Sequence, residues 1–325
     1  MAGHEIGDDP MQPDVPAAPS RPSFSFELWP PRSPAAEQTL HVHLARLVAT
    51  RPDFISVTYG ANGSSRDGSL AVLRHLLQNT DVSPMAHFTA VGSSFADASQ
   101  LLREFLDAGI TRFLALRGDP PAGVPEEELV LGDFRSASEL VQLIHGVQRE
   151  REPFVTHEVR GFPGARRLGS GRKVTIAVAA FPNGHPLSRS RAQDIDTLLA
   201  KEAAGANLAI TQLFFEADDY LQLVDDARAA GVTMPILPGI QPVLSEQRLH
   251  RMLQLSGEAM PTELLRALRA TDDPASAGIA HATALSRDVL AGGAPGIHLY
   301  TSNRSEAPLA ILGDVGLLTS REIPA

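Results

Sequence analysis

The sequence predicts an α/β fold and, within that class, a single TIM (β/α)8 barrel. From residue 24 onward, short apolar runs that favour strands alternate with longer stretches of helical periodicity, which is the pattern of a parallel sheet. Eight such runs occur, and eight is the number of strands in this barrel. No Gly-x-Gly-x-x-Gly turn follows the first run, which continues instead into Trp29, Pro30 and Pro31.

Each predicted strand is a short run of apolar, β-branched or aromatic side chains. In chain order, the runs cover residues 24–28, 54–59, 85–90, 113–117, 174–180, 208–213, 236–240 and 297–301.

Between these runs, apolar residues recur at three- and four-residue spacing, the period of a helix with one buried face. The clearest such stretches are 36–49, 96–108, 137–149, 190–204 and 218–230. Gly109, Gly205 and Gly231 stand just before the next strands, where a glycine in the left-handed conformation ends a helix and turns the chain.

An open, doubly wound parallel sheet is the alternative architecture for this alternation. Such a sheet normally carries its glycine-rich turn directly after the first strand, so the lack of that turn favours the barrel. Two long connections rich in Pro, Gly and Arg, residues 118–136 and 150–172, are expected to be surface insertions or lids.

Composition sets the limits of the domain and of its partners. Residues 1–21 hold almost no large apolar side chain, so we expect a disordered tail there and a barrel domain over residues 22–325. The net charge of −10 argues against nucleic-acid and anionic-membrane partners. The lack of cysteine excludes disulfides and thiolate chemistry. Without a membrane-length apolar stretch or a signal peptide, a cytoplasmic enzyme is expected.

Polar residues follow most of the predicted strands. In a TIM barrel the carboxyl ends of the strands meet at one rim, and the active site lies there. The residues expected at this rim are Glu27, Thr58, Tyr59, His87, Arg117, Gly118, Asp119, His185, Gln212 and Arg304.

Glu27 is the strongest candidate for a catalytic residue. It follows Phe26 in an apolar strand, where a charge is costly unless it is paired or used. Burial would raise the pKa of its carboxyl group and suit it to general acid catalysis. A structural ion pair is the alternative.

The other candidates also have structural interpretations. Arg117, Gly118 and Asp119 could form a helix-capping turn with an ion pair, His87 could be a core histidine, and Thr58 and Gln212 could bond neighbouring backbone. His41 and His43 are two residues apart in a helical stretch and therefore face different directions. We expect both to be solvated, and we expect no metal site.

All of the rim residues except His87 belong to six short sequence blocks. The blocks are Phe24-Ser-Phe-Glu-Leu-Trp-Pro-Pro-Arg32, Phe54-Ile-Ser-Val-Thr-Tyr-Gly-Ala-Asn62, Leu116-Arg-Gly-Asp119, Ala180-Phe-Pro-x-x-His-Pro186, Gly205-Ala-Asn-x-Ala-Ile-Thr-Gln212 and Tyr300-Thr-x-Asn-Arg304. In this order and at this spacing, they resemble the methylenetetrahydrofolate reductase family over about residues 23 to 315.

The resemblance implies an FAD-containing barrel that takes a hydride from NADH or NADPH and passes it to 5,10-methylenetetrahydrofolate, giving 5-methyltetrahydrofolate for methionine synthesis. Glu27 then matches the family's acid, and Asp119 matches the carboxylate beside the flavin and the pterin. Gln212 matches a residue that hydrogen-bonds the pterin. Arg304 matches one that receives the glutamate carboxylate of folate.

The family's FAD-contacting positions are spread along the chain. They match Thr58, Tyr59, Ala61, His87, Arg117, Gly118, Asp119, Phe181, His185, Ser188, Asp194 and Lys201. Phe181 stands where many members have tyrosine. Asp194 and Lys201 share one predicted helix, from which Lys201 is expected to reach the phosphates or adenosine of the cofactor.

Two other functions remain open at this point. One is a flavin-free reductase that passes hydride directly from NADH to folate, since Thr197 and Ala200 replace polar or basic residues of the family. The other is a barrel without catalysis that binds folate or a partner protein. The resemblance also implies a homo-oligomer.

Overall fold

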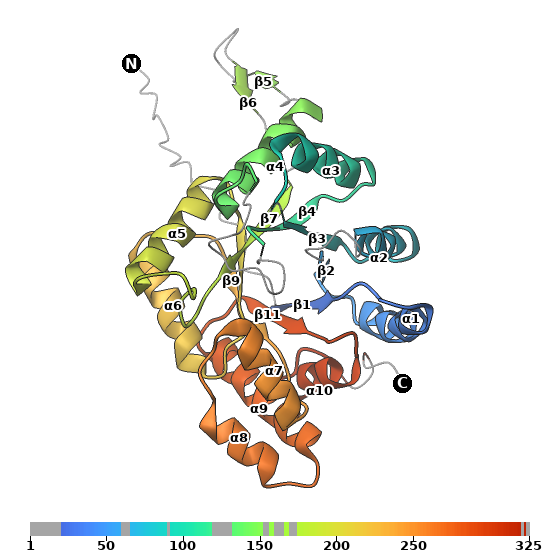
Figure 1. The fold of residues 1–325 in the computed structure, drawn as a ribbon, viewed down its shortest axis with the longest axis vertical. Coiled ribbons are helices and arrows are strands. Elements are labelled where there is room, and N and C mark those ends of the chain that lie inside the picture. The colour runs from blue at the N-terminus through green and yellow to red at the C-terminus, as the bar shows by residue number, and fades with distance from the viewer. Residues whose placement is uncertain are drawn as a thin grey trace, which may run out of the picture.

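The computed structural model describes residues 21–59, 66–89, 92–118, 132–151, 156–158, 166–168, 174–319 and 322. Its parallel strands form one sheet that curves into a barrel, with helices outside it (Figure 1). The sheet order is β10-β11-β1-β2-β3-β4-β7-β8-β9. These strands are β1 (Ser23–Leu28), β2 (Phe54–Val57), β3 (Pro84–Thr89), β4 (Arg112–Leu116), β7 (Thr175–Ala180), β8 (Leu208–Thr211), β9 (Ile236–Leu237), β10 (Gly239–Ile240) and β11 (Gly296–Tyr300).

The seventh strand of the barrel is interrupted at Pro238, which divides it into β9 and β10. β9 pairs with β8, and β10 pairs with β11, so the two short pieces connect the ends of the sheet. Proline has no backbone N–H to give to a sheet, but its carbonyl accepts a 2.9 Å hydrogen bond from the His298 amide. The barrel predicted from the sequence is confirmed, and the open sheet is wrong.

The helices lie outside the strands and cover them (Figure 1). They are α1 (Pro34–Ala49), α2 (Arg66–Asn79), α3 (Phe95–Asp107), α4 (Ala137–Arg151), α5 (Arg191–Ala203), α6 (Ala217–Ala229), α7 (Glu246–Ser256), α8 (Thr262–Arg269), α9 (Pro274–Ala291) and α10 (Glu306–Asp314). The five helical stretches singled out in the sequence are confirmed as α1, α3, α4, α5 and α6. Gly109, Gly205 and Gly231 all have positive φ, as expected for glycines that end helices.

The long connection after α4, expected to be a surface insertion or a lid, contains secondary structure of its own. It contains an antiparallel pair, β5 (Thr156–Glu158) and β6 (Arg166–Leu168), which stands apart from the barrel sheet. The predicted disordered tail lies outside the described residues except for its last residue, Arg21, and most of the 118–136 connection lies outside them as well.

Strand side chains alternate between two apolar layers, as the two-residue period of a strand requires. In β1, Phe24, Phe26 and Leu28 join the large outer core beneath the helices. A smaller cluster takes single residues from successive strands, which are Phe54, Met85, Leu114, Ala177, Ile210 and Leu237. This second cluster fills the barrel interior, so the polar side chains two residues further along the strands face inward above it.

No helix among the described residues is long and apolar enough to cross a membrane.

Two helical glycines differ in what surrounds them and give a matched test of this packing. A Cβ at Gly278 in α9 would lie 1.6 Å from the carbonyl oxygen of Val243, whereas a Cβ at Gly146 in α4 would meet nothing within 4 Å. We expect Gly278→Ala to destabilise the fold by about 1–3 kcal/mol or more through overpacking. Gly146→Ala should stabilise it by roughly 0.5–1 kcal/mol. Urea unfolding measures both, and equal effects would contradict the packing described for α9.

Candidate active site

A buried carboxylate and two histidines meet inside the barrel at the carboxyl ends of its strands. Glu27 comes from β1, His87 from β3 and His298 from β11, and they are 8%, 6% and 0% exposed. Oε2 of Glu27 lies 3.3 Å from Nε2 of His87 and 3.6 Å from Nε2 of His298. Among the described residues, neither Nε2 atom has a partner with hydrogen-bond geometry, so the two contacts are ion-pair approaches. We call Glu27, His87, His298 and Ser25 the Glu27 cluster.

Ser25 orients His298 from the far side of the ring. Ser25 and His298 are register partners across β1 and β11, and Ser25 Oγ lies 2.7 Å from Nδ1 of His298. The ring also stacks on Phe54, with centroids 5.6 Å apart. If Nδ1 accepts a hydrogen bond from the Ser25 hydroxyl, the neutral imidazole of His298 carries its own proton on Nε2, on the side that faces Glu27. Serine, histidine and carboxylate then form a continuous polar chain.

The electrostatics of Glu27 correct one expectation from the sequence. Burial does raise the pKa of the carboxyl group, as expected, but the close approach of His87 and His298 outweighs burial and lowers the pKa from 4.5 to about 2. The prediction of a raised pKa is therefore wrong, because the histidines that surround Glu27 were not known to converge on it. Glu27 is an ionised carboxylate held between two potential proton carriers.

Tyr300 and Gln212 border the same interior. The Tyr300 hydroxyl donates a 2.9 Å hydrogen bond to the Thr211 carbonyl, and burial together with the charge of Glu27 raises the pKa of this phenol well above its usual value. Oε1 of Gln212 accepts from the Leu213 amide at 2.9 Å. This is the backbone contact considered as the structural interpretation, but it leaves the donor Nε2 of Gln212 without a partner among the described residues.

A second polar group lies after β7 and contains four of the expected cofactor positions. Asp194 accepts from the His185 amide at 3.2 Å and from the Ser188 hydroxyl, while the Phe181 and His185 rings meet edge to face at 4.7 Å. His185, Ser188 and Asp194, with neighbouring residues, line a hollow of about 300 Å³, which we call the β7 hollow. Its lining residues are Pro182, Asn183, Gly184, His185, Ser188, Arg189, Ser190, Arg191 and Asp194.

Lys201 lies beneath this hollow and does not open into it. The side chain is buried, and Nζ donates a 2.8 Å hydrogen bond to the Ala179 carbonyl and lies 5.9 Å from the centre of the Phe181 ring. Burial lowers the pKa of Lys201 to about 8, with the nearby charge of Asp194 acting in the opposite direction. That Lys201 reaches a cofactor from this helix stays a prediction.

Of the remaining predicted positions, some lie at strand ends, one faces the outer core, and two lie outside the described residues. Thr58 lies at the end of β2, where its carbonyl accepts a 2.7 Å hydrogen bond from the Ser69 hydroxyl. Arg117 and Gly118 follow β4, and Gly118 has a φ of 95°. Tyr59 packs edge to face on Phe105 of α3, so its ring faces the outer core. Ala61 and Asp119 lie outside the described residues.

The structure also changes the interpretation of three histidines. His87 contacts Glu27 and is therefore more than a core histidine. His298 was missed, although a histidine between Ile297 and Leu299 in an apolar strand was a visible signal. His43 was expected to be solvated, but it is only 6% exposed and contacts the segment before α10. His41 is exposed, as expected.

Arg304 lies on the outer side of the rim. Its NH1 group is 3.2 Å from Nε2 of His43 on α1, and the side chain as a whole is exposed. The sequence placed Arg304 at the rim, but it did not indicate this contact with a helix outside the barrel.

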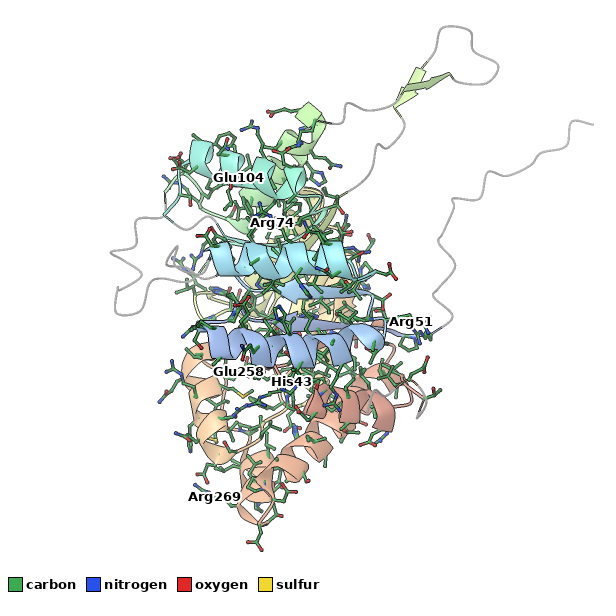
Figure 2. The ribbon with its side chains drawn as sticks, turned by 90° about the vertical axis from the view of Figure 1, so that its right-hand side faces the viewer. His43, Arg51, Arg74, Glu104, Glu258 and Arg269 are labelled. Atoms are coloured by element: carbon green, nitrogen blue, oxygen red, sulfur yellow. The ribbon has the colours of Figure 1, made fainter. Side chains whose placement is uncertain are left out.

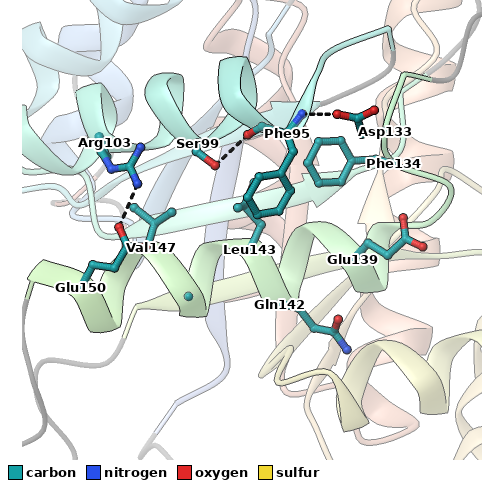
Figure 3. A pocket seen from close by; sticks show the side chains of 11 residues that line it. Phe95, Ser99, Arg103, Asp133, Phe134, Glu139, Gln142, Leu143, Val147 and Glu150 are labelled. Carbon is teal, nitrogen blue, oxygen red and sulfur yellow. Dashed lines mark hydrogen bonds and ion pairs between the residues drawn. The ribbon is translucent and has the colours of Figure 1, made fainter.

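A larger hollow of about 370 Å³ lies between α3 and α4, outside the barrel. Figure 3 shows Phe95 and Phe134 stacked in it, with Leu143 and Val147 beside them and an ion pair between Arg103 and Glu150. None of its lining residues belongs to the Glu27 cluster or to the β7 hollow. Size alone therefore does not identify the active site. In the described part of the chain, no three His, Asp or Glu side chains are grouped to hold a metal ion.

Comparison with known proteins gives consistent matches. The family described as methylenetetrahydrofolate reductase matches residues 15–316. The 5,10-methylenetetrahydrofolate reductase of Escherichia coli is 31% identical over 91% of this chain and 91% of its own length. The probable NADH-dependent methylenetetrahydrofolate reductase of Oryza sativa is 32% identical over 94% of this chain, which spans about half (50%) of that relative.

A solved Clostridium thermocellum protein that binds two copies of 5-methyl-5,6,7,8-tetrahydrofolic acid shares the fold. Its TM-score is 0.59 at 12% sequence identity, with 90% of this chain and 93% of that chain covered.

The lowered pKa of Glu27 predicts an acid-dependent contribution to stability. A carboxyl group whose pKa is depressed on folding stabilises the protein above its unfolded pKa, near 4.5, and this stabilisation is lost as the pH falls toward about 2. The gap in unfolding free energy between the wild type and Glu27→Gln should therefore shrink by about 2 kcal/mol from about pH 5 to about pH 3. Urea unfolding at each pH measures the gap.

Glu263→Gln is the matched control, because Glu263 is an exposed residue that pairs with Arg266 on α8. The difference in unfolding free energy between the wild type and Glu263→Gln should stay small at every pH. A constant gap for Glu27→Gln would show that the carboxylate gains nothing from the two histidines.

Proposed function

This chain belongs to the methylenetetrahydrofolate reductase family, and from that membership we propose that it reduces 5,10-methylenetetrahydrofolate to 5-methyltetrahydrofolate with a hydride that originates from NADH or NADPH. The observation that carries the proposal beyond family membership is the Glu27 cluster. It places a buried carboxylate and two imidazoles at the rim where barrel enzymes keep their chemistry.

The reaction needs a proton at one nitrogen of the folate. Protonation of N10 lets the bond between N10 and the bridging carbon break, which leaves a cationic iminium at N5, and a hydride added to that carbon completes the methyl group. With a pKa of about 2, Glu27 on its own holds no proton near neutral pH. We therefore assign the acid to the cluster, in which an imidazole supplies the proton and Glu27 passes it to N10.

Glu27 serves a second purpose in this scheme. Glu27 is only 8% exposed, so its negative charge lies in an interior where charges interact more strongly than in water. Once the proton has left for N10, the carboxylate stabilises the positive charge that develops on the iminium. Asp119, which lies outside the described residues, is proposed to assist, a role that the family resemblance suggests.

The β7 hollow has the chemistry expected of an FAD site. It combines the carboxylate of Asp194 and the hydroxyl of Ser188 with the guanidinium groups of Arg189 and Arg191, beside the first turn of α5. Carboxylates and hydroxyls suit ribose, and cations beside a helix N-terminus suit a pyrophosphate. FAD, when bound, accepts a hydride from the nicotinamide and donates it to the folate. Phe181 and His185 offer ring faces and edges to hold it.

Two residues are proposed to recognise folate. The unpartnered Nε2 of Gln212 points to a hydrogen bond with the pterin, since a donor at a rim position gains by pairing with a ligand. The exposed guanidinium of Arg304 is proposed to receive the glutamate carboxylate, because only part of its donor fork is used by His43. The predicted flavin contacts that remain are Thr58, Tyr59, Ala61, His87, Arg117, Gly118 and Lys201, and the homo-oligomer remains a prediction.

Separating the half-reactions tests the role of Glu27. Glu27→Gln keeps the shape of the side chain but cannot pass a proton, so oxidation of NADH or NADPH by bound FAD should continue within about threefold of the wild-type rate. Folate reduction should fall by at least about 10²-fold. Rapid-mixing absorbance of the flavin follows each half-reaction separately.

The exposed Glu263→Gln variant should behave as the wild type in both half-reactions. An equal loss in the two half-reactions of Glu27→Gln would mean that Glu27 is structural.

Two aspartates on α5 allow a matched test of the cofactor site. Asp194 lines the β7 hollow, whereas Asp196, two residues later, is exposed and does not. Asp194→Ala should weaken FAD binding by roughly 10- to 100-fold, the loss expected when a charged hydrogen-bonding group is removed. Asp196→Ala should leave it unchanged. FAD fluorescence on titration into the apoprotein gives both affinities.

The same titration decides between the alternative functions. A protein that stays colourless with added FAD and still reduces methylenetetrahydrofolate would be a flavin-free reductase. One that binds folate and shows no turnover would be the binding barrel.

A further inference from the structure

His43 is buried where α1 meets the segment that leads into α10. Figure 2 labels it on the side of α1 that faces the C-terminal helices. Its ring contacts three consecutive residues of that segment. Nε2 lies 3.2 Å from NH1 of Arg304, and Nδ1 lies 3.0 Å from Oγ of Ser305 and 3.6 Å from Oε1 of Glu306. A histidine on an outer helix thereby reaches the one predicted folate-binding arginine.

The chemistry of arginine fixes the direction of this hydrogen bond. A guanidinium carries five N–H donors and has no acceptor, so Nε2 of His43 must accept from Arg304. A neutral imidazole carries its single proton on the other nitrogen. Nδ1 faces Ser305, whose Oγ lies 3.0 Å away and accepts from NH1 of Arg46, and whose backbone amide lies 3.4 Å away. The contact with Arg304 exists only while Nε2 is unprotonated.

Two guanidinium groups and one carboxylate lie around the His43 ring and the serine that it contacts. Arg304 approaches from the segment before α10 and Arg46 from α1 itself, while Glu306 at the start of α10 is the one carboxylate among the groups that contact the ring. A proton on Nε2 would remove the acceptor and place two cations 3.2 Å apart.

The backbone that presents Arg304 is also constrained. Ser302 and Asn303 have φ values of 51° and 58°, a left-handed conformation that is costly for residues other than glycine and persists only where the surroundings hold it. Asn303 provides that hold, because its side chain accepts from the Trp29 amide at 2.8 Å and donates to the Trp29 carbonyl at 2.9 Å. The contact between Asn303 and Trp29 therefore fixes the backbone before Arg304, and His43 fixes the side chain of Arg304.

We propose that His43 is a positioning residue for substrate: its neutral imidazole holds the Arg304 guanidinium on the α1 side of the rim, with the other donors of the fork free for the glutamate carboxylate of folate. The inference rests on the proposed function, in which Arg304 receives that carboxylate. Holding a long side chain in place before binding removes part of the entropy lost on binding, so His43 acts on affinity for folate and not on the chemical step.

Two amide substitutions separate the two nitrogens of the ring. In His43→Gln, the side-chain oxygen can take the place of Nε2 and still accept from Arg304. In His43→Asn, the shorter amide can keep only the contact made by Nδ1 with Ser305. Each variant is assayed with 5,10-methylenetetrahydrofolate and with 5,10-methylenetetrahydropteroate, which lacks the glutamate.

We expect His43→Asn to raise KM for the folate by about 5- to 10-fold, the effect of one lost hydrogen bond, with kcat unchanged. KM for the pteroate should not change, and His43→Gln should stay within about twofold of the wild type for both substrates. His43→Leu removes the acceptor with an apolar side chain suited to a buried site, and it should repeat the result of His43→Asn if that variant does not fold. His41→Gln, an exposed neighbour on α1, is the control.

A purely structural histidine predicts the opposite order, with His43→Asn near wild type and His43→Gln impaired for both substrates. That result, or an equal rise in KM for folate and pteroate, would overturn the proposal. The variant Arg304→Ala separates this failure from a failure of the proposed function. If Arg304→Ala raises KM for folate alone while His43→Asn changes nothing, only the role of His43 is wrong. If Arg304→Ala does not distinguish the two substrates, the proposed folate contact is wrong as well.

Discussion

The pairing of β1 with β11 is the constraint on which the rest of the site depends. It joins the first and last strands of the barrel in parallel register and brings together residues more than 270 positions apart, as the 273-residue separation of Ser25 and His298 illustrates. The same pairing sets Glu27 beside Tyr300. Just beyond the strands it brings Trp29 against Asn303. Without this closure, no acid cluster and no anchored segment before Arg304 would exist.

Closure also explains why ionisable groups are tolerated in the barrel interior. A lone carboxylate there would be neutralised by burial, and a lone imidazole would lose its proton for the same reason. Because His87 and His298 lie beside it, Glu27 stays ionised in spite of its burial.

Much of the fold could be predicted from the sequence because its signals are local. Strand and helix periods, and the glycines at helix ends, depend on neighbouring residues, and the family blocks are short. The interruption at Pro238 and the orientation of Tyr59 depend on packing between distant elements. The carboxyl ends of the strands were correctly taken as the place of Glu27 and His87, because topology alone puts them there.

What the sequence could not supply was mutual geometry within the site. The pKa of Glu27 is lowered and not raised as expected, because two histidine rings from β3 and β11 lie beside it. No spacing along the chain encodes their approach. His43 was misjudged for a related reason. Helical periodicity says which residues share a face, but not that the face of His43 meets the segment before α10.

The two hydrogen bonds between Trp29 and Asn303 have a consequence for the fluorescence of this protein. The sequence contains one tryptophan, and that residue stands at the rim with 46% of its surface exposed. Indole emission from this protein therefore comes from one place, two residues after Glu27 on the chain. An event that covers the rim, shifts the end of β11 or loosens Asn303 will change the wavelength or the intensity of the tryptophan fluorescence. Changes elsewhere in the barrel will leave the fluorescence unaltered.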